Sequence, residues 1–174
     1  MRSQLVILDA NVIIDAHKMG LWKHLTSQYR VQVPSTVLRE EARFFKNRYD
    51  QQVDIDLQTN LSAGQIQEIE ATAEELEALT LAATSSFLRS IDEGETEAIA
   101  ILRGGRFKES VFCTGDQLAI KAISVFELSD QAVSFERLLN DSGSSIKCLP
   151  RHYSEERLKK LLVEGFQERE LYRQ

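Results

Sequence analysis

The chain has 174 residues, of which 43% are hydrophobic and 28% charged, with a formal net charge of −6. This composition is typical of a globular protein with one sizeable core. The acidic balance argues against broad, non-specific nucleic-acid binding, which depends on Lys and Arg at the phosphates. No apolar run has membrane-spanning length and the start lacks a signal-peptide pattern, so we expect a cytoplasmic protein without a membrane partner. Cys113 and Cys148 match neither a disulfide framework nor a zinc motif.

The first structural signal is a short apolar run at residues 5–8 that ends at Asp9. Such a run predicts a strand buried on both faces. In parallel α/β sheets, ligands bind at the carboxyl ends of strands, where Asp9 would present its carboxylate and Asn11 follows. Asp is also a good helix N-cap, so capping of the predicted helix at 11–26 is the competing interpretation.

The middle of the chain alternates between predicted strands and helices. We predict a strand at 30–34 and a helix from 36 to about 48. Period-two alternation predicts a strand at 52–58, and 65–71 is its return strand in a hairpin, although the spacing of its two isoleucines also suits a helix. A capping box, with Thr followed three residues later by Glu, begins a helix at 72–83.

The second half continues this alternation. Residues 86–103 are predicted to be helical, in two pieces broken near Gly94. The remaining predicted elements are a strand at 110–114, a helix at 117–122, a strand at 124–128 and a helix at 130–140. We divide the chain into a domain at 1–150 and a C-terminal segment at 151–174, whose helix we expect to pack on the domain rather than on a partner.

Two of the predicted strands end in aspartate, at Asp9 and, after Gly115, at Asp116. If these strands are neighbours, both carboxylates reach one edge of the sheet. Two close carboxylates repel unless a cation lies between them, and oxygen ligands favour Mg²⁺ or Mn²⁺ over zinc. The three histidines show no ligand spacing.

Helices can supply further carboxylates to this edge. Glu40 lies near the middle of the second predicted helix, and Glu97 is followed by small or apolar residues that indicate a face close to the core. Glu93 lies one turn before Glu97 and would share its face. We interpret Glu41, Glu95 and Asp92 as exposed charges.

With these residues assembled, the chain resembles the PIN-domain family of metal-dependent nucleases, including its VapC-like toxins. The resemblance covers most of residues 4–140 and rests on four segments: 8–15, 33–41, 94–100 and 111–116. It implies an α/β fold of three layers, α/β/α, in which helices cover both faces of a central, mostly parallel sheet.

The resemblance also implies an acidic site and its chemistry. The catalytic residues would be Asp9, Glu40, Glu97 and Asp116, with Asn11 and Thr114 in support. Asp9, Glu97 and Asp116 would hold Mg²⁺ or Mn²⁺, so that an activated water hydrolyses RNA to a 3′-hydroxyl and a 5′-phosphate. Two positions stay open: Glu41 competes with Glu40, and Glu93 or Glu95 competes with Glu97.

The resemblance implies an RNA substrate, an antitoxin-type protein partner if the chain is a toxin, and a homodimer. The first alternative is a catalytically silent PIN-like interaction module. The second is a phosphatase with Asp9 as nucleophile, which is disfavoured because Asn11 occupies the position of the required general acid.

Overall fold

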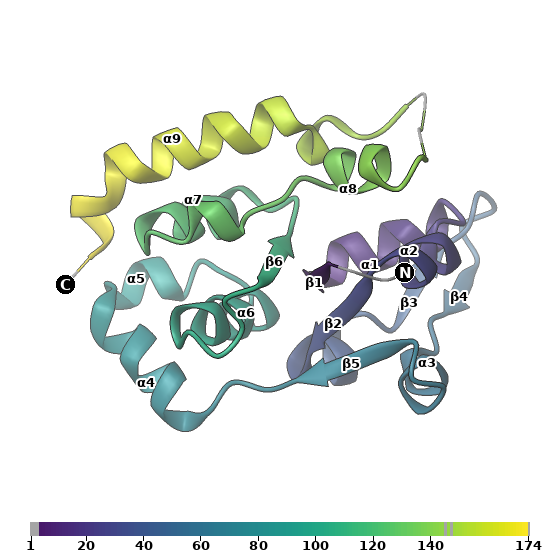
Figure 1. The fold of residues 1–174 in the computed structure, drawn as a ribbon, viewed down its shortest axis with the longest axis horizontal. Helices are drawn as coiled ribbons and strands as arrows, with labels where there is room; N and C mark the ends of the chain where they lie inside the picture. The colour runs from purple at the N-terminus through teal and green to yellow at the C-terminus, as the bar shows by residue number, and fades with distance from the viewer. Residues whose placement is uncertain (1–3, 145, 147, 174) are drawn as a thin grey trace.

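Four parallel strands form the centre of the structure, a computed structural model that describes residues 4–144, 146 and 148–173 (Figure 1). The sheet order is β5-β2-β1-β6, which makes β1 a central strand. The strands are β1 (Leu5–Leu8), β2 (Arg30–Pro34), β5 (Ile66–Ile69) and β6 (Ser110–Cys113). Helices flank the sheet, so the predicted three-layer α/β/α class is confirmed, as are the strands expected at 5–8, 30–34 and 110–114.

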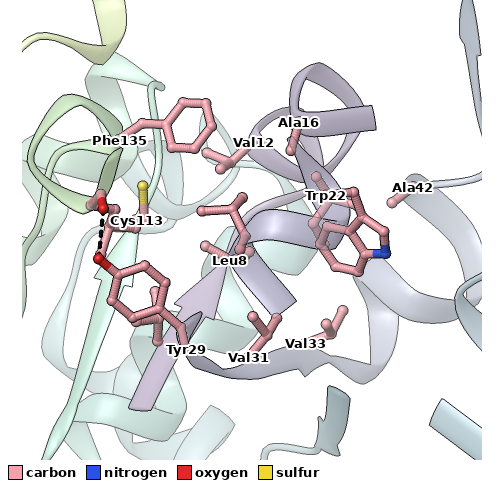
Figure 2. Close-up of a cluster of buried hydrophobic side chains, with 14 of the residues drawn as sticks. Leu8, Val12, Ala16, Trp22, Tyr29, Val31, Val33, Ala42, Cys113 and Phe135 are labelled. Atoms are coloured by element: carbon pink, nitrogen blue, oxygen red, sulfur yellow. Dashed lines mark hydrogen bonds between the residues drawn. The ribbon is translucent and has the colours of Figure 1, made fainter. Parts of the chain in front are cut away.

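The side chains of β1 alternate between two hydrophobic cores, one on each face of the sheet. Val6 and Leu8 face the core in Figure 2, where the Tyr29 hydroxyl donates a 2.6 Å hydrogen bond to the Leu138 carbonyl. Ile7 faces the opposite core. Helices with residues in the first core are α1 (Ala10–Lys18), α2 (Trp22–Gln28), α3 (Leu57–Ser62) and α8 (Phe135–Asp141). Helices with residues in the second are α4 (Ala73–Ala82), α5 (Ser85–Leu88), α6 (Glu93–Arg103) and α7 (Gln117–Val125).

The region between β2 and β5 differs most from the sequence prediction. The helix expected at 36–48 begins as predicted but is much shorter: residues 35–36 are helical and continue into a π-helical turn, η1 (Val37–Glu41), where it ends. It leads into β3 (Phe44–Lys46), which pairs with β4 (Gln52–Asp54) in a separate antiparallel ribbon. The hairpin predicted between 52–58 and 65–71 is wrong, since β5 pairs in parallel with β2.

Several helix boundaries shift for local reasons. The helix expected at 11–26 is split into α1 and α2 at Gly20, which has a φ of +72°. The capping box before α4 is confirmed. The strand expected at 124–128 is wrong, because α7 continues to Val125, and α8 begins at Phe135 after the N-cap Ser134. The segment η2 (Ser129–Gln131) is a short 3-10 helix between them.

The C-terminal segment forms η3 (Arg151–Tyr153) and the long helix α9 (Glu155–Tyr172), which packs along α7 (Figure 1). Gly165 permits this close packing, since a Cβ atom there would lie 2.5 Å from the Lys121 carbonyl oxygen. The Lys121 ammonium lies 3.2 Å from Glu164 and 2.9 Å from Glu168. Within the described part of the chain, no helix has the length and apolar character needed to span a membrane.

Candidate functional site

The candidate site lies where β1 and β6 end side by side. From β1 the chain proceeds to β2 on one side, and it later enters β6 on the other side, so the strand order changes direction between β1 and β6. Such a switch point leaves a crevice at the carboxyl ends of the strands. Leu8 pairs with Cys113, and the Asp9 amide donates a 3.1 Å hydrogen bond to the Cys113 carbonyl. The backbone therefore places Asp9 next to Thr114.

One hydroxyl group joins two buried carboxylates at this point. Thr114 Oγ1 lies 3.2 Å from Asp9 Oδ2 and 2.9 Å from Glu95 Oε1, and the residues are only 2% (Asp9) and 1% (Glu95) exposed. A hydroxyl has a single proton to donate, so it satisfies one carboxylate at a time. Glu95 Oε2 is buried and has no hydrogen-bond partner among the described residues. This oxygen lacks the proton donor or cation that a buried carboxylate requires.

Asp116 reaches the cluster through the same threonine. Its backbone amide donates to Thr114 Oγ1 at 3.0 Å, while its Oδ1 accepts from Leu118 N at 2.7 Å and Ala119 N at 2.9 Å. Asp116 is therefore the N-cap of α7. Asp9 has the same double role, because its Oδ1 accepts a 2.6 Å hydrogen bond from Ala10 N at the start of α1. Both interpretations of Asp9, helix cap and member of an acidic cluster, are compatible with its geometry.

Glu41 approaches the cluster from the π-helical turn after β2. Its Oε1 accepts a 2.9 Å hydrogen bond from Gly94 N, in the first turn of α6. The positive end of the helix dipole favours a carboxylate there. A Cβ atom on Gly94 would collide with the Glu41 carboxylate, so glycine is required for this approach.

The electrostatics of the cluster reflect crowded carboxylates. Burial, followed by the charges of Asp9 and Asp116, raises the pKa of Glu95 to about 9. Burial also raises the pKa of Asp9 to about 7, with a smaller contribution from the charge of Glu41. The pKa of Glu41 itself is raised, mainly by burial. Without a cation, these groups hold their protons to a higher pH than ordinary carboxyl groups.

The structure brings some predicted site residues together and separates others. Glu97 is 7% exposed, but its two carboxylate oxygens accept backbone hydrogen bonds from Thr36 N (2.9 Å) and Ala71 N (3.2 Å). It therefore ties α6 to the loops that follow β2 and β5. The candidates Glu40, Glu93 and Asn11 are exposed. Asp9, Thr114 and Asp116 lie together, and two of the three open alternatives, Glu41 and Glu95, join them. The interpretation of Glu95 as an exposed charge is wrong, because the residue is 1% exposed.

The donor atoms of the cluster suit a divalent cation, although their present arrangement does not. Its carboxylate oxygens are the ligands that Mg²⁺ and Mn²⁺ prefer, and Glu95 Oε2 has a vacant acceptor. In residues 4–144, 146 and 148–173, no three acidic, His or Cys side chains are already arranged to hold a metal. Hydrogen bonds from backbone amides orient Glu41 Oε1 and Asp116 Oδ1, so binding would require side-chain rotations. The donor chemistry fits the ion, and the present arrangement is not a finished coordination shell.

A groove of about 670 Å³ lies between η1, α4 and the start of α6, and its lining contains Glu97 but none of the cluster residues Asp9, Glu41, Glu95, Thr114 and Asp116. Leu76, Leu88 and Ile91 give it an apolar lining, and Arg39 and Arg89 contribute positive charge. Glu40, Glu93 and Glu97 also line it, and Glu40 and Glu93 are direct neighbours in sequence of Glu41 and Gly94.

Comparison of the chain with protein-family models, curated proteins and solved structures gave no match. The function therefore has to be inferred from the chemistry of the cluster itself.

Proposed function

We propose that the protein is a metal-dependent nuclease that hydrolyses phosphodiester bonds of RNA at this cluster. The observation that carries the proposal is the unpartnered, buried Glu95 Oε2 beside Asp9 and Asp116, at a sheet switch point. Bringing like charges together is unfavourable, and a divalent cation offsets that repulsion. The choice of RNA comes from the PIN-domain resemblance.

Each residue of the cluster has a distinct part in this proposal. Asp9, Glu95 and Asp116 would hold Mg²⁺ or Mn²⁺, which supplies an activated water and neutralises charge on the phosphate. Glu41 would accept the proton of the attacking water, because burial raises its pKa and makes it a stronger base than an ordinary carboxylate. Thr114 orients Asp9 and Glu95 through its hydroxyl. Water adds to phosphorus, the bond to the 3′-oxygen breaks, and the products are a 3′-hydroxyl and a 5′-phosphate.

The test is cleavage of a labelled single-stranded RNA in Mn²⁺, with calorimetric titration of Mn²⁺ as a second measurement. Wild type should cleave and bind the ion, whereas Asp9→Asn, Glu95→Gln and Asp116→Asn should lose both, and EDTA should stop cleavage. Glu40→Gln is the matched control, since Glu40 is an exposed carboxylate next to Glu41. Equal cleavage by all variants would reject the site.

A toxin role would follow from the same activity. Expression in growing cells should then arrest growth with the wild-type chain and not with Asp9→Asn. Absence of both Mn²⁺ binding and cleavage in wild type would reject the nuclease and favour the interaction module.

A further inference from the structure

The C-terminal segment touches the turn that carries Asp116. A Cβ atom on Gly115 would lie 2.6 Å from a ring carbon of Tyr153 and 2.7 Å from a ring carbon of His152. Tyr153 is 1% exposed, and its hydroxyl donates a 2.6 Å hydrogen bond to Asp15 Oδ2 on α1. These contacts fix η3 against the loop between Thr114 and Asp116, and so beside the acidic cluster.

An incompletely satisfied guanidinium lies on the same side. Arg157 Nη2 donates a 3.2 Å hydrogen bond to Gln117 Oε1, the residue directly after Asp116. Arg157 Nε is buried and has no hydrogen-bond partner among the described residues, nor does the structure record a carboxylate within ion-pair distance there. A guanidinium has five N–H donors. The buried Nε cannot reach a ligand, so the donors that remain for one are those of Nη1, for which no hydrogen bond is found among the described residues, and the second N–H of Nη2. The buried cation of α7, Lys121, contrasts with it because two glutamates pair with it.

Two more side chains add to this surface. Arg151 and His152 are exposed on η3, and neither forms an ion pair within the part of the chain that the structure describes. The first turn of α9 carries Glu155 and Glu156. Glu155 is already engaged by the Ser134 hydroxyl at 2.6 Å and by Lys159 at 3.5 Å, and no ion pair of Glu156 with these cations is found among the described residues. The surface beside the cluster therefore offers positive charge that the protein itself does not neutralise.

This arrangement suits a phosphate group. Guanidinium groups bind phosphate oxygens through paired hydrogen bonds, which are stronger than hydrogen bonds between neutral groups. In a chain of net charge −6, the acidic cluster repels a polyanion, so local cations have to hold the backbone near it. We propose that Arg151, His152 and Arg157 form a phosphate-binding rim that holds the backbone of single-stranded RNA beside the acidic cluster. This rests on the proposed function and names the substrate contacts of that site.

The test measures binding separately from cleavage. Asp9→Asn combined with Glu95→Gln removes turnover and two ionisable carboxyl groups, and fluorescence anisotropy of a labelled single-stranded RNA gives the affinity across a KCl series. Adding Arg157→Met, which keeps the aliphatic bulk, should weaken binding about tenfold. It should also reduce the slope of log affinity against log salt by about 0.7, the value for one lost phosphate contact on a single strand.

Matched variants distinguish binding by the rim from a general effect of positive charge on the protein surface. Lys160→Met removes an exposed cation of the same helix, and it should leave the salt slope unchanged. Arg151→Gln, at an exposed site that tolerates substitution, should lower the slope, and Arg157→Lys should restore part of the affinity. Equal effects of Lys160→Met and Arg157→Met, or no RNA binding at all, would overturn the rim. If Arg157→Met leaves RNA binding unchanged while the wild-type chain still cleaves RNA with metal, the phosphate-binding rim is overturned and the proposed nuclease activity stands.

Discussion

Glu97 is the residue whose structural role can be distinguished most clearly from a catalytic one. Its two oxygens accept hydrogen bonds from Thr36 N and Ala71 N, at 2.9 and 3.2 Å, in an environment that is 7% exposed. A hydrogen bond to a charged group contributes about 1.5–3 kcal/mol to stability. We expect Glu97→Ala to lower the free energy of unfolding by about 3–5 kcal/mol, since both backbone donors lose their acceptor. Glu97→Gln should lose about half as much, because its carbonyl oxygen still accepts one bond.

Urea unfolding measures this effect directly. With a slope of about 1–3 kcal/mol per M, the midpoint of Glu97→Ala should fall by at least about 1 M. Glu93→Ala is the control, because Glu93 is an exposed carboxylate of the same helix, and its stability should stay within about 0.5 kcal/mol of wild type.

The Mn²⁺ titration supplies the contrary outcome. If Glu97→Ala unfolds at the wild-type midpoint but loses Mn²⁺ binding, Glu97 is a metal ligand, as the PIN-domain resemblance implies. The structural role derived from its two backbone contacts would then be refuted.

Three further predictions concern the cluster and the packing around it. The folded-state pKa values of Asp9 and Glu95, about 7 and about 9, exceed their ordinary values of 3.8 and 4.5, so in EDTA the free energy of unfolding should fall as pH rises from about 4 to about 9. Glu95→Gln should reduce the loss of stability above pH 7. Urea midpoints at pH 5, 7 and 9 measure this loss, and a variant with the wild-type pH profile would contradict the prediction. Gly94→Ala should displace the Glu41 carboxylate and reduce RNA cleavage, and full activity speaks against that contact. It should also lower the stability, because the new Cβ atom would lie 2.5 Å from Cγ2 of the buried Val37, which outweighs the helix preference of Ala of up to about 1 kcal/mol. Gly165→Ala should lower the stability by about 1–3 kcal/mol in thermal unfolding, through overpacking of α9 against α7, and a wild-type melting temperature would exclude it.

The parts of the fold that could be predicted from the sequence are those encoded locally. β1 and β6 are short apolar runs, and the aspartate at the end of β1 and the one that follows β6 belong to the cluster, as their positions indicated. β4 lies within the strand predicted at 52–58, but its partner β3 was missed, because β3 is short and largely exposed and lies in a segment predicted to be helical. The packing of α9 on α7 could not be predicted, because it depends on contacts between distant segments, at Lys121 of α7 and Gly165 of α9.

The choice between Glu95 and Glu97 shows the limit of such reasoning. Both residues belong to α6 and both are buried, so apolar neighbours in sequence correctly indicate burial for Glu97 without showing what it contacts. Residues two positions apart on a helix, such as Glu95 and Glu97, point in very different directions. Glu97 meets backbone amides of Thr36 and Ala71, whereas Glu95 meets Thr114, and only the assembled sheet determines these partners.

The position of β1 in the sheet has a consequence for the order of synthesis. Of the four strands of this sheet, β1 is made first, yet one of its two neighbours is β6, in which Ser110 pairs with Leu5. Until that segment emerges, one edge of β1 has no native strand to pair with, and such long-range pairing is slow and prone to aggregation. Asp9 is made well before Glu95, Thr114 and Asp116, so the acidic cluster cannot assemble until the chain has been made at least as far as Asp116. A site assembled from such distant segments is absent from any nascent chain that still lacks β6 and the turn after it.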